Sequence, residues 1–282
     1  MWNLKKPNIS AVRSHLDTIF PPSAVPVLLT AEHKDALERL YKDYEQASGR
    51  PLSTLKAANL EGAVSAQVLA AYSEVTDGGK LSALRSALML SVDECPYCGF
   101  GEIRDLDHHL QKAHFQCFSI FPLNLVPACA KCNGHKPRKP RTDPDKHHIH
   151  AYLEDVSAHM FLVADVVLKK NAMIVRFRIK KSRKVKGELF ARLCQHLEDF
   201  HLNDRYPARV NIFLSEQKTG LEFAFNVGGA DAVRAFLERS ADASEAAFGK
   251  NDWRTALFIA LAKSKRFCKG GFYQALGYKS KP

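Results

Sequence analysis

The chain has 282 residues, a net charge of +11 and 46% hydrophobic composition. That is enough apolar material for one large core or two to three small ones, which excludes a disordered polypeptide. Asp165 and Lys169 interrupt the most hydrophobic stretch, so no uncharged run reaches the roughly 18 residues that span a bilayer. The first residues lack the apolar core of a secretory signal. We expect a cytoplasmic protein with an anionic partner.

The first ninety residues predict a small helical unit. Thr30 can cap a helix that runs to about Ser48, where apolar residues recur at helical spacing until Gly49-Arg50-Pro51 stops them. Two further helices are predicted over 51–72 and 80–91, separated by the turn-forming sequence at 76–79.

Beyond residue 150 the pattern predicts a β-hairpin followed by helices. Two β-rich runs, 161–168 and 172–179, are joined by Lys169-Lys170-Asn171. Helices are predicted over 186–200, 230–240 and 252–264. The segment 209–227 is ambiguous, because Val210, Ile212 and Leu214 alternate as in a strand while the run is too short to exclude a helix.

Two Cys-x-x-Cys pairs, Cys95/Cys98 and Cys129/Cys132, frame a segment rich in histidine. Each spacing lets two thiolates of one tight turn bind one tetrahedral Zn²⁺, and two turns complete its coordination. A closed four-sulfur shell leaves no position for water, so we expect this zinc to be structural. The other three cysteines, Cys117, Cys194 and Cys268, are expected to be small buried hydrophobes.

The segment between the pairs contains Leu106-Asp107-His108-His109-Leu110, then Pro122-Leu123-Asn124-Leu125-Val126-Pro127, then Cys132-Asn133-Gly134-His135-Lys136. This run of about fifty residues resembles the HNH, or ββα-metal, nucleases, in particular the branch that carries a zinc clamp. Independently of the resemblance, 103–108 and 123–126 are predicted strands, and 128–136 is a predicted short helix ended by Pro137. Asn133 and Lys136 then share a helix face with Cys129 and Cys132.

A hard cation such as Mg²⁺ or Mn²⁺ prefers oxygen ligands, and Asp107 with Asn133 can supply a carboxylate and an amide oxygen. A histidine suits the general base at neutral pH, and by position we assign this role to His108. His109 is the alternative, since adjacent side chains of a regular strand face opposite ways. The resemblance implies that Asn124 ties down the loop between the strands and orients the base.

The cations around this segment are expected to contact DNA phosphates without reading sequence. Those predicted to bind DNA are Lys131, Lys136, Arg138, Lys139, Arg141, Lys181, Arg183 and Lys184. A solvated basic face is the alternative, mainly for the cluster around residues 180–186.

Together these features predict an α+β fold with a helical region (1–92), a zinc-clamped ββα-metal HNH core (93–150) and a mostly helical C-terminal region with a hairpin (151–282). The predicted function is metal-dependent hydrolysis of DNA phosphodiesters by an endonuclease. By analogy with nuclease subunits of bacterial anti-phage defence systems, an ATPase partner is also expected. The alternatives are a non-catalytic zinc-clamped DNA-binding module and a subunit that is silent until its partner assembles.

Overall fold

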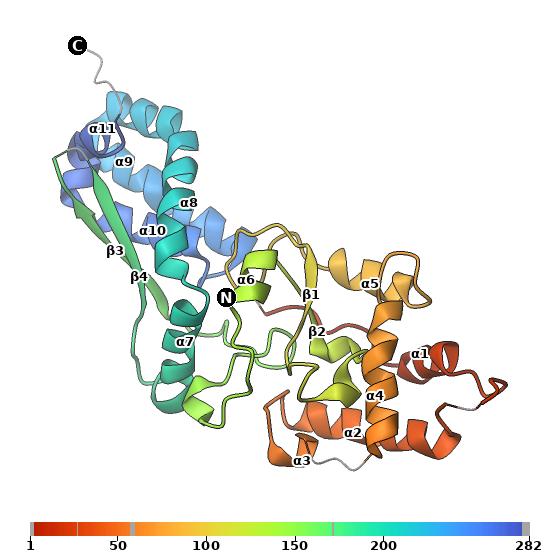
Figure 1. Cartoon of the computed structure of the whole chain (residues 1–282). Helices are drawn as coiled ribbons and strands as arrows, with labels where there is room; N and C mark the ends of the chain where they lie inside the picture. Colours follow the sequence, from red (N-terminus) through yellow and green to blue (C-terminus); the bar gives the residue numbers. More distant parts are fainter. Residues whose placement is uncertain (1–2, 27, 57–59, 171, 278–282) are drawn as a thin grey trace. The chain divides into compact units, whose positions relative to one another are not determined.

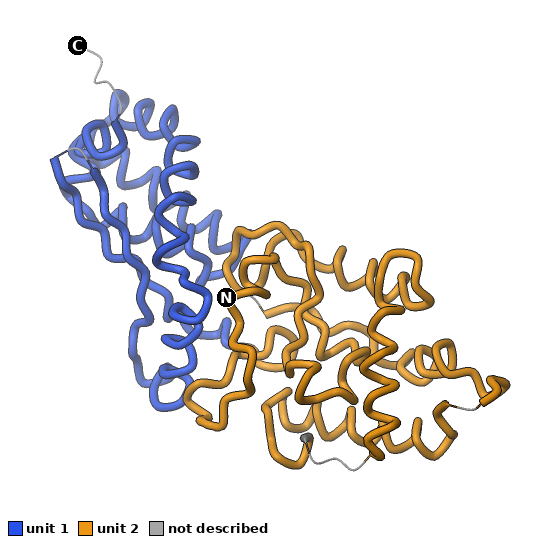
Figure 2. The backbone as a smooth tube through the Cα atoms, viewed as in Figure 1, with its two compact units in different colours: residues 1–2, 156–282 blue, residues 3–155 orange. Residues whose placement is uncertain are grey.

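The computed structural model describes residues 3–277 except 27, 57–59 and 171, and it confirms the mixed α+β fold (Figure 1). The chain divides into two compact units, residues 3–155 and residues 156–282 (Figure 2). None of the helices in the described ranges is long and apolar enough to cross a membrane.

Along the sequence, the first unit begins with a group of helices and ends with a two-stranded sheet and a short helix. They are α1 (Val12–Ile19), α2 (Ala31–Gln46), α3 (Ser53–Lys56), α4 (Gly62–Ala70), the 3₁₀ turn η1 (Ala71–Glu74) and α5 (Ser82–Met89). The 3₁₀ turns η2 (Gln116–Phe118) and η3 (Pro122–Asn124) follow β1 (Asp105–His108), and β2 (Leu125–Ala128), α6 (Ala130–His135) and η4 (Pro144–Lys146) complete the unit.

The helix α2 begins and ends where the sequence signals stand. Thr30 forms a capping box with His33, and its hydroxyl accepts a hydrogen bond from the His33 amide at 3.2 Å. Gly49 ends the turn with φ +67° and donates its N–H to the Tyr44 carbonyl at 2.9 Å. The predicted helix over 51–72 is divided between α3, α4 and η1, and its residues 57–59 lie outside the described part.

An aromatic core joins α2 to the segment between the two strands. The Tyr41 and Phe121 rings stack with centroids 4.2 Å apart, and Tyr44 packs against Phe118 at 4.9 Å. The N–H of Leu4 donates to the carbonyl of Ala151 at 2.8 Å, so the start and the end of the unit are also tied. The sequence-based regions 1–92 and 93–150 therefore share one core, and this unit extends to Asp155.

The described residues of the second unit form the predicted hairpin, five α-helices and one π turn. The strands β3 (Leu162–Leu168) and β4 (Met173–Ile179) pair antiparallel, with Leu162 opposite Ile179. The residue Asn171 of the predicted turn lies outside the described residues. The helices are α7 (Gly187–Asp199), α8 (Leu202–Glu216), α9 (Lys218–Phe248), α10 (Trp253–Lys263) and α11 (Phe272–Ala275), with the π turn η5 (Phe267–Gly271).

The ambiguous segment 209–227 is helical, in α8 and α9. Val210 and Leu214 are buried, whereas Ile212 is 54% exposed. In a strand all three side chains would lie on one face. In the helix only Val210 and Leu214, which are four residues apart, share the buried face. The helix predicted over 230–240 is part of α9, which is kinked at Gly228 and Gly229.

Candidate metal centre and adjoining polar site

Four buried cysteine side chains converge from two segments of the first unit. Cys95 and Cys98 precede β1, whereas Cys129 and Cys132 lie at the start of α6, and the four sulfur atoms lie within 4.8 Å of one another. The Cys98 and Cys129 sulfurs are 3.9 Å apart. This excludes a disulfide, whose bond is about 2.05 Å, and approaches the edge of about 3.8 Å expected for a tetrahedron of Zn–S bonds near 2.3 Å.

Local backbone structure holds the cysteines in these positions. The Cys129 sulfur caps α6 by accepting the N–H of Cys132 at 3.4 Å, and the N–H of Cys95 donates to the Gly101 carbonyl at 2.9 Å. A Cβ atom on Gly101 would lie only 2.6 Å from the Cys129 sulfur. The cluster is thus packed on all sides by protein, as a structural metal site requires.

The carboxylates of β1 face the exposed end of the same short helix. Asp105 and Asp107 lie two residues apart on β1 and therefore on the same face of the strand, where Asp107 is opposite Val126 of β2. Asn133 and Lys136 lie on one face of α6, Lys136 at its C-terminal end. The Asn133 amide donates to Asp105 Oδ2 at 3.0 Å, and the Lys136 ammonium donates to Asp107 Oδ2 at 2.6 Å. The structure therefore brings the predicted metal ligands to one face but gives each a different partner.

Lys136 is buried, which differs from its predicted role as a cation that contacts DNA. Its side chain is 3% exposed and that of Asp107 is 5% exposed. Besides Asp107, the ammonium donates to the His108 carbonyl at 2.7 Å, and the Tyr97 hydroxyl donates to the same Asp107 oxygen at 2.7 Å. Burial lowers the pKa of Lys136, and Asp107 partly opposes this shift. In this arrangement the ammonium neutralises the carboxylate from inside the protein.

His108 lies on the other side of the strand from Asp107. Its Nε2 is 3.0 Å from the Ser119 carbonyl oxygen, which can only accept, so the neutral ring carries its proton there. The ring packs against Tyr72 with centroids 4.4 Å apart. Burial lowers the pKa of His108 to about 4, although the Ser119 carbonyl and Asp107 oppose the shift. The imidazole is therefore neutral at pH 7, but its Nε2 is engaged.

His109 lies two residues beyond Asp107 and contacts a histidine that the sequence did not single out. The His109 and His150 rings are 4.1 Å apart. His150 Nδ1 accepts the Tyr152 N–H at 3.1 Å, so its Nε2 donates to the Tyr44 hydroxyl at 3.0 Å. Burial lowers the pKa of His150 to about 3. A fixed neutral ring thus supports His109.

Asn124 is fully buried at the end of this chain of hydrogen bonds. Its side-chain oxygen accepts from the Tyr44 hydroxyl at 3.0 Å and from the Leu110 N–H at 2.7 Å. Its amide donates to the carbonyls of Leu110 and Phe118, both at 3.1 Å. Asn124 thereby holds the loop after β1, and this loop carries His109.

The remaining predicted DNA-binding residues lie at the surface of their units. Lys131, Arg138 and Lys139 are exposed and Arg141 is half-buried in the first unit, while Lys181, Arg183 and Lys184 are exposed in the second. Sequence reasoning missed Asp105, Tyr97 and His150. The alternation of Asp105 with Asp107 was a usable signal for the first, whereas the positions of the other two depend on tertiary folding.

The fold and the site define a class: an α+β protein in which a four-cysteine metal-binding cluster clamps a short β-hairpin to a short helix. In the described part of the chain, this cluster is the one group of three or more cysteine, histidine or carboxylate side chains placed to hold an ion. The adjoining polar face comprises Asp105, Asp107, Asn133 and Lys136.

The chain is similar to protein ea31 of Escherichia phage lambda, with 26% identity over 198 residues. The matching region covers 65% of this chain and 66% of the phage protein, so the chain spans just under two thirds of that relative. No protein-family model matches the chain. No solved structure matches it either.

Proposed function

We propose that the protein is a metal-dependent endonuclease of the HNH type that hydrolyses DNA, with a structural Zn²⁺ in the four-cysteine cluster. The observation that carries the proposal is the meeting of β1 and α6, where two carboxylates and the Asn133 carboxamide lie on one face beside the cluster. The four buried sulfurs fit Zn²⁺ in number, element and spacing.

Oxygen ligands for Mg²⁺ or Mn²⁺ are available on this face. Asp107 and Asn133 are the proposed ligands, and Asp105 is an additional candidate because it already contacts Asn133. When bound, such an ion would polarise the phosphodiester and stabilise the leaving 3′ oxygen. Lys136 must then release Asp107 Oδ2, from which its ammonium is now 2.6 Å away.

The base that accepts the proton of the attacking water is one of two histidines. His108 remains the choice by motif, but its Nε2 is directed at the Ser119 carbonyl. His109 follows Asp107 by two positions, and its loop is fixed by Asn124. The geometry therefore supports His109 more strongly. The products expected are 5′ phosphate and 3′ hydroxyl ends.

The test is relaxation of supercoiled plasmid by zinc-loaded protein in EDTA, Mg²⁺ or Mn²⁺. We expect cleavage only with the divalent ion, and a rate lower by roughly 10²- to 10⁴-fold for the variant that lacks the base. Asp107→Asn should be inactive, whereas the exposed Asp77→Asn is the matched control. If His108→Ala and His109→Ala both cut as fast as the parent, the assignment fails.

A second candidate is a zinc-clamped DNA-binding module without catalysis. The buried Lys136–Asp107 ion pair favours it, because the carboxylate is already neutralised without a metal. This candidate predicts DNA binding that weakens with salt but no cleavage with any divalent ion. If a partner such as an ATPase releases Lys136, cleavage should appear only in the complex. A role in anti-phage defence stays part of the proposal by analogy with the nuclease subunits of such systems.

A further inference from the structure

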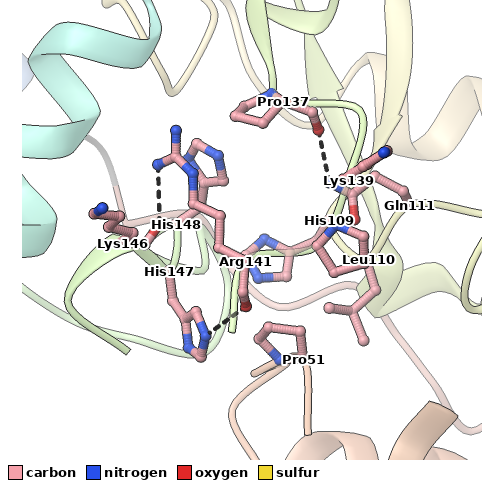
Figure 3. A pocket seen from close by; sticks show the side chains of 11 residues that line it. Pro51, His109, Leu110, Gln111, Pro137, Lys139, Arg141, Lys146, His147 and His148 are labelled. Atoms are coloured by element: carbon pink, nitrogen blue, oxygen red, sulfur yellow. Dashed lines mark hydrogen bonds between the residues drawn. The ribbon is translucent and has the colours of Figure 1, made fainter. Parts of the chain in front are cut away.

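A pocket beside the polar face is lined mainly by cations and imidazoles (Figure 3). The space between its walls measures about 340 Å³, a volume that includes open solvent. Six of its lining residues carry or can carry positive charge: Lys139, Arg141, Lys146, His109, His147 and His148. None of the described residues that line it is acidic, and none is Phe, Tyr or Trp.

The wall of the pocket is a loop that follows α6 and is closed on itself. The Arg141 guanidinium donates to the Lys146 carbonyl at 3.1 Å, and His147 Nε2 donates to the Arg141 carbonyl at 3.0 Å. Gln111, which follows the β1 loop, donates to the Pro137 carbonyl at 2.7 Å. Figure 3 shows these three bonds with Arg141 amid the labelled histidines. Pro51, Pro137 and Pro140 further restrict the wall.

These properties select the chemistry of the ligand. A lining of lysine, arginine and histidine side chains disfavours a metal cation and favours an anion with several acceptor oxygens. The absence of Phe, Tyr and Trp from the described lining gives a base no large aromatic platform on which to stack. Arg and Lys side chains in a pre-formed, half-open site are suited to a phosphate group.

We propose that this pocket holds one backbone phosphate of the bound DNA, next to the phosphodiester that is cut. The inference rests on the proposed function and adds a location to it. His109 lines the pocket and also lies two residues after Asp107, so a phosphate in the pocket is adjacent to the proposed catalytic face. A phosphate held in the pocket would therefore fix the position of the DNA strand along β1 and α6.

The experiment measures DNA binding separately from cleavage, by fluorescence anisotropy of a short labelled duplex in EDTA at several salt concentrations. The logarithm of the binding constant falls linearly with the logarithm of the salt concentration, and one lost phosphate contact reduces the steepness of this line by about 0.9. We expect this decrease for Arg141→Gln and for Lys139→Gln. The exposed Lys80→Gln removes the same charge elsewhere in the unit and should leave the slope unchanged.

Because Arg141 also holds the loop, the exposed Lys139 provides the variant with little structural effect. An unchanged slope in both pocket variants would overturn the proposal, whether or not the protein cleaves DNA. Inorganic phosphate is the second probe, and its binding is detected by NMR as shifts of the histidine imidazole resonances. Shifts with inorganic phosphate combined with unchanged DNA slopes would assign the pocket to the free ion and refute the DNA role.

Discussion

Replacing Lys136 with Met tests the buried ion pair that distinguishes this site. The change removes the ammonium that lies 2.6 Å from Asp107 Oδ2 and leaves the carboxylate buried without a counter-ion. The Tyr97 hydroxyl, at 2.7 Å from the same oxygen, still donates a hydrogen bond but carries no charge. Removing one member of a buried pair typically costs about 3–5 kcal/mol. Since the side chains of Lys136 and Asp107 are 3% and 5% exposed, solvent cannot compensate, and a loss in this range is expected.

Urea unfolding of the zinc-loaded protein measures this loss. The exposed Lys131→Met on the same helix is the control, with an expected change within about 0.5 kcal/mol. Asp107→Asn combined with Lys136→Met removes both charges, so a coupling energy of roughly 2 kcal/mol or more is expected from the double-mutant cycle. A Lys136→Met protein within about 1 kcal/mol of the parent would refute the reasoning.

Three other predictions follow from the same unit. Gly49→Ala should lower the free energy of unfolding by more than about 2 kcal/mol, because the left-handed φ is combined with a Cβ placed 2.2 Å from His150 Cδ2. The control Gly78→Ala, with φ +83° but no atom nearby, should lower it by only about 1 kcal/mol. Equal losses in urea unfolding would exclude the contact with His150. Gly101→Ala should release zinc to a chelator faster than Gly134→Ala, because only the former's Cβ would meet the Cys129 sulfur, at 2.6 Å; equal release rates, followed with a colorimetric zinc indicator, would contradict this. The free energy of unfolding should fall as the pH drops below 6.5, because the folded pKa values of His108 and His150, about 4 and about 3, lie below the ordinary value of 6.5 and the unfolded chain binds these protons first. Well above pH 6.5 both rings are neutral in the folded and unfolded chain, so the free energy of unfolding is at its full value. At pH 5 it should be lower by roughly 2 kcal/mol per histidine. Equal unfolding free energies at pH 7.5 and pH 5 would count against this prediction.

Local signals predicted the elements of the fold where the chain carries its own stop and start residues. Thr30 and Gly49 bound α2, and the β-rich runs before and after residues 169–171 form the hairpin of β3 and β4. The segment 209–227 was not resolved, because its alternation resembled a strand until tertiary packing buried Val210 and Leu214 and left Ile212 exposed. Helix and strand periods cannot be separated over so few residues.

The candidate site was predictable in its composition but not in its pairings. The spacing of the four cysteines was enough to predict their cluster. Helical spacing placed Lys136 on the face of Cys129 and Cys132, but its ion pair with Asp107 depends on how α6 packs against β1 and could not be read from the sequence. Strand alternation, in contrast, already separated Asp107 from His108 and raised His109 as the alternative.

The most direct test of the central claim is whether the face formed by β1 and α6 binds a hard cation. Mn²⁺ added to zinc-loaded protein can be followed by electron paramagnetic resonance, because the signal of the free aqueous ion falls as it binds. We predict one site per chain, lost in Asp107→Asn and weakened in Asn133→Ala, with the zinc content unchanged in both. Equal Mn²⁺ binding by the parent and Asp107→Asn, or none by the parent, would contradict the account.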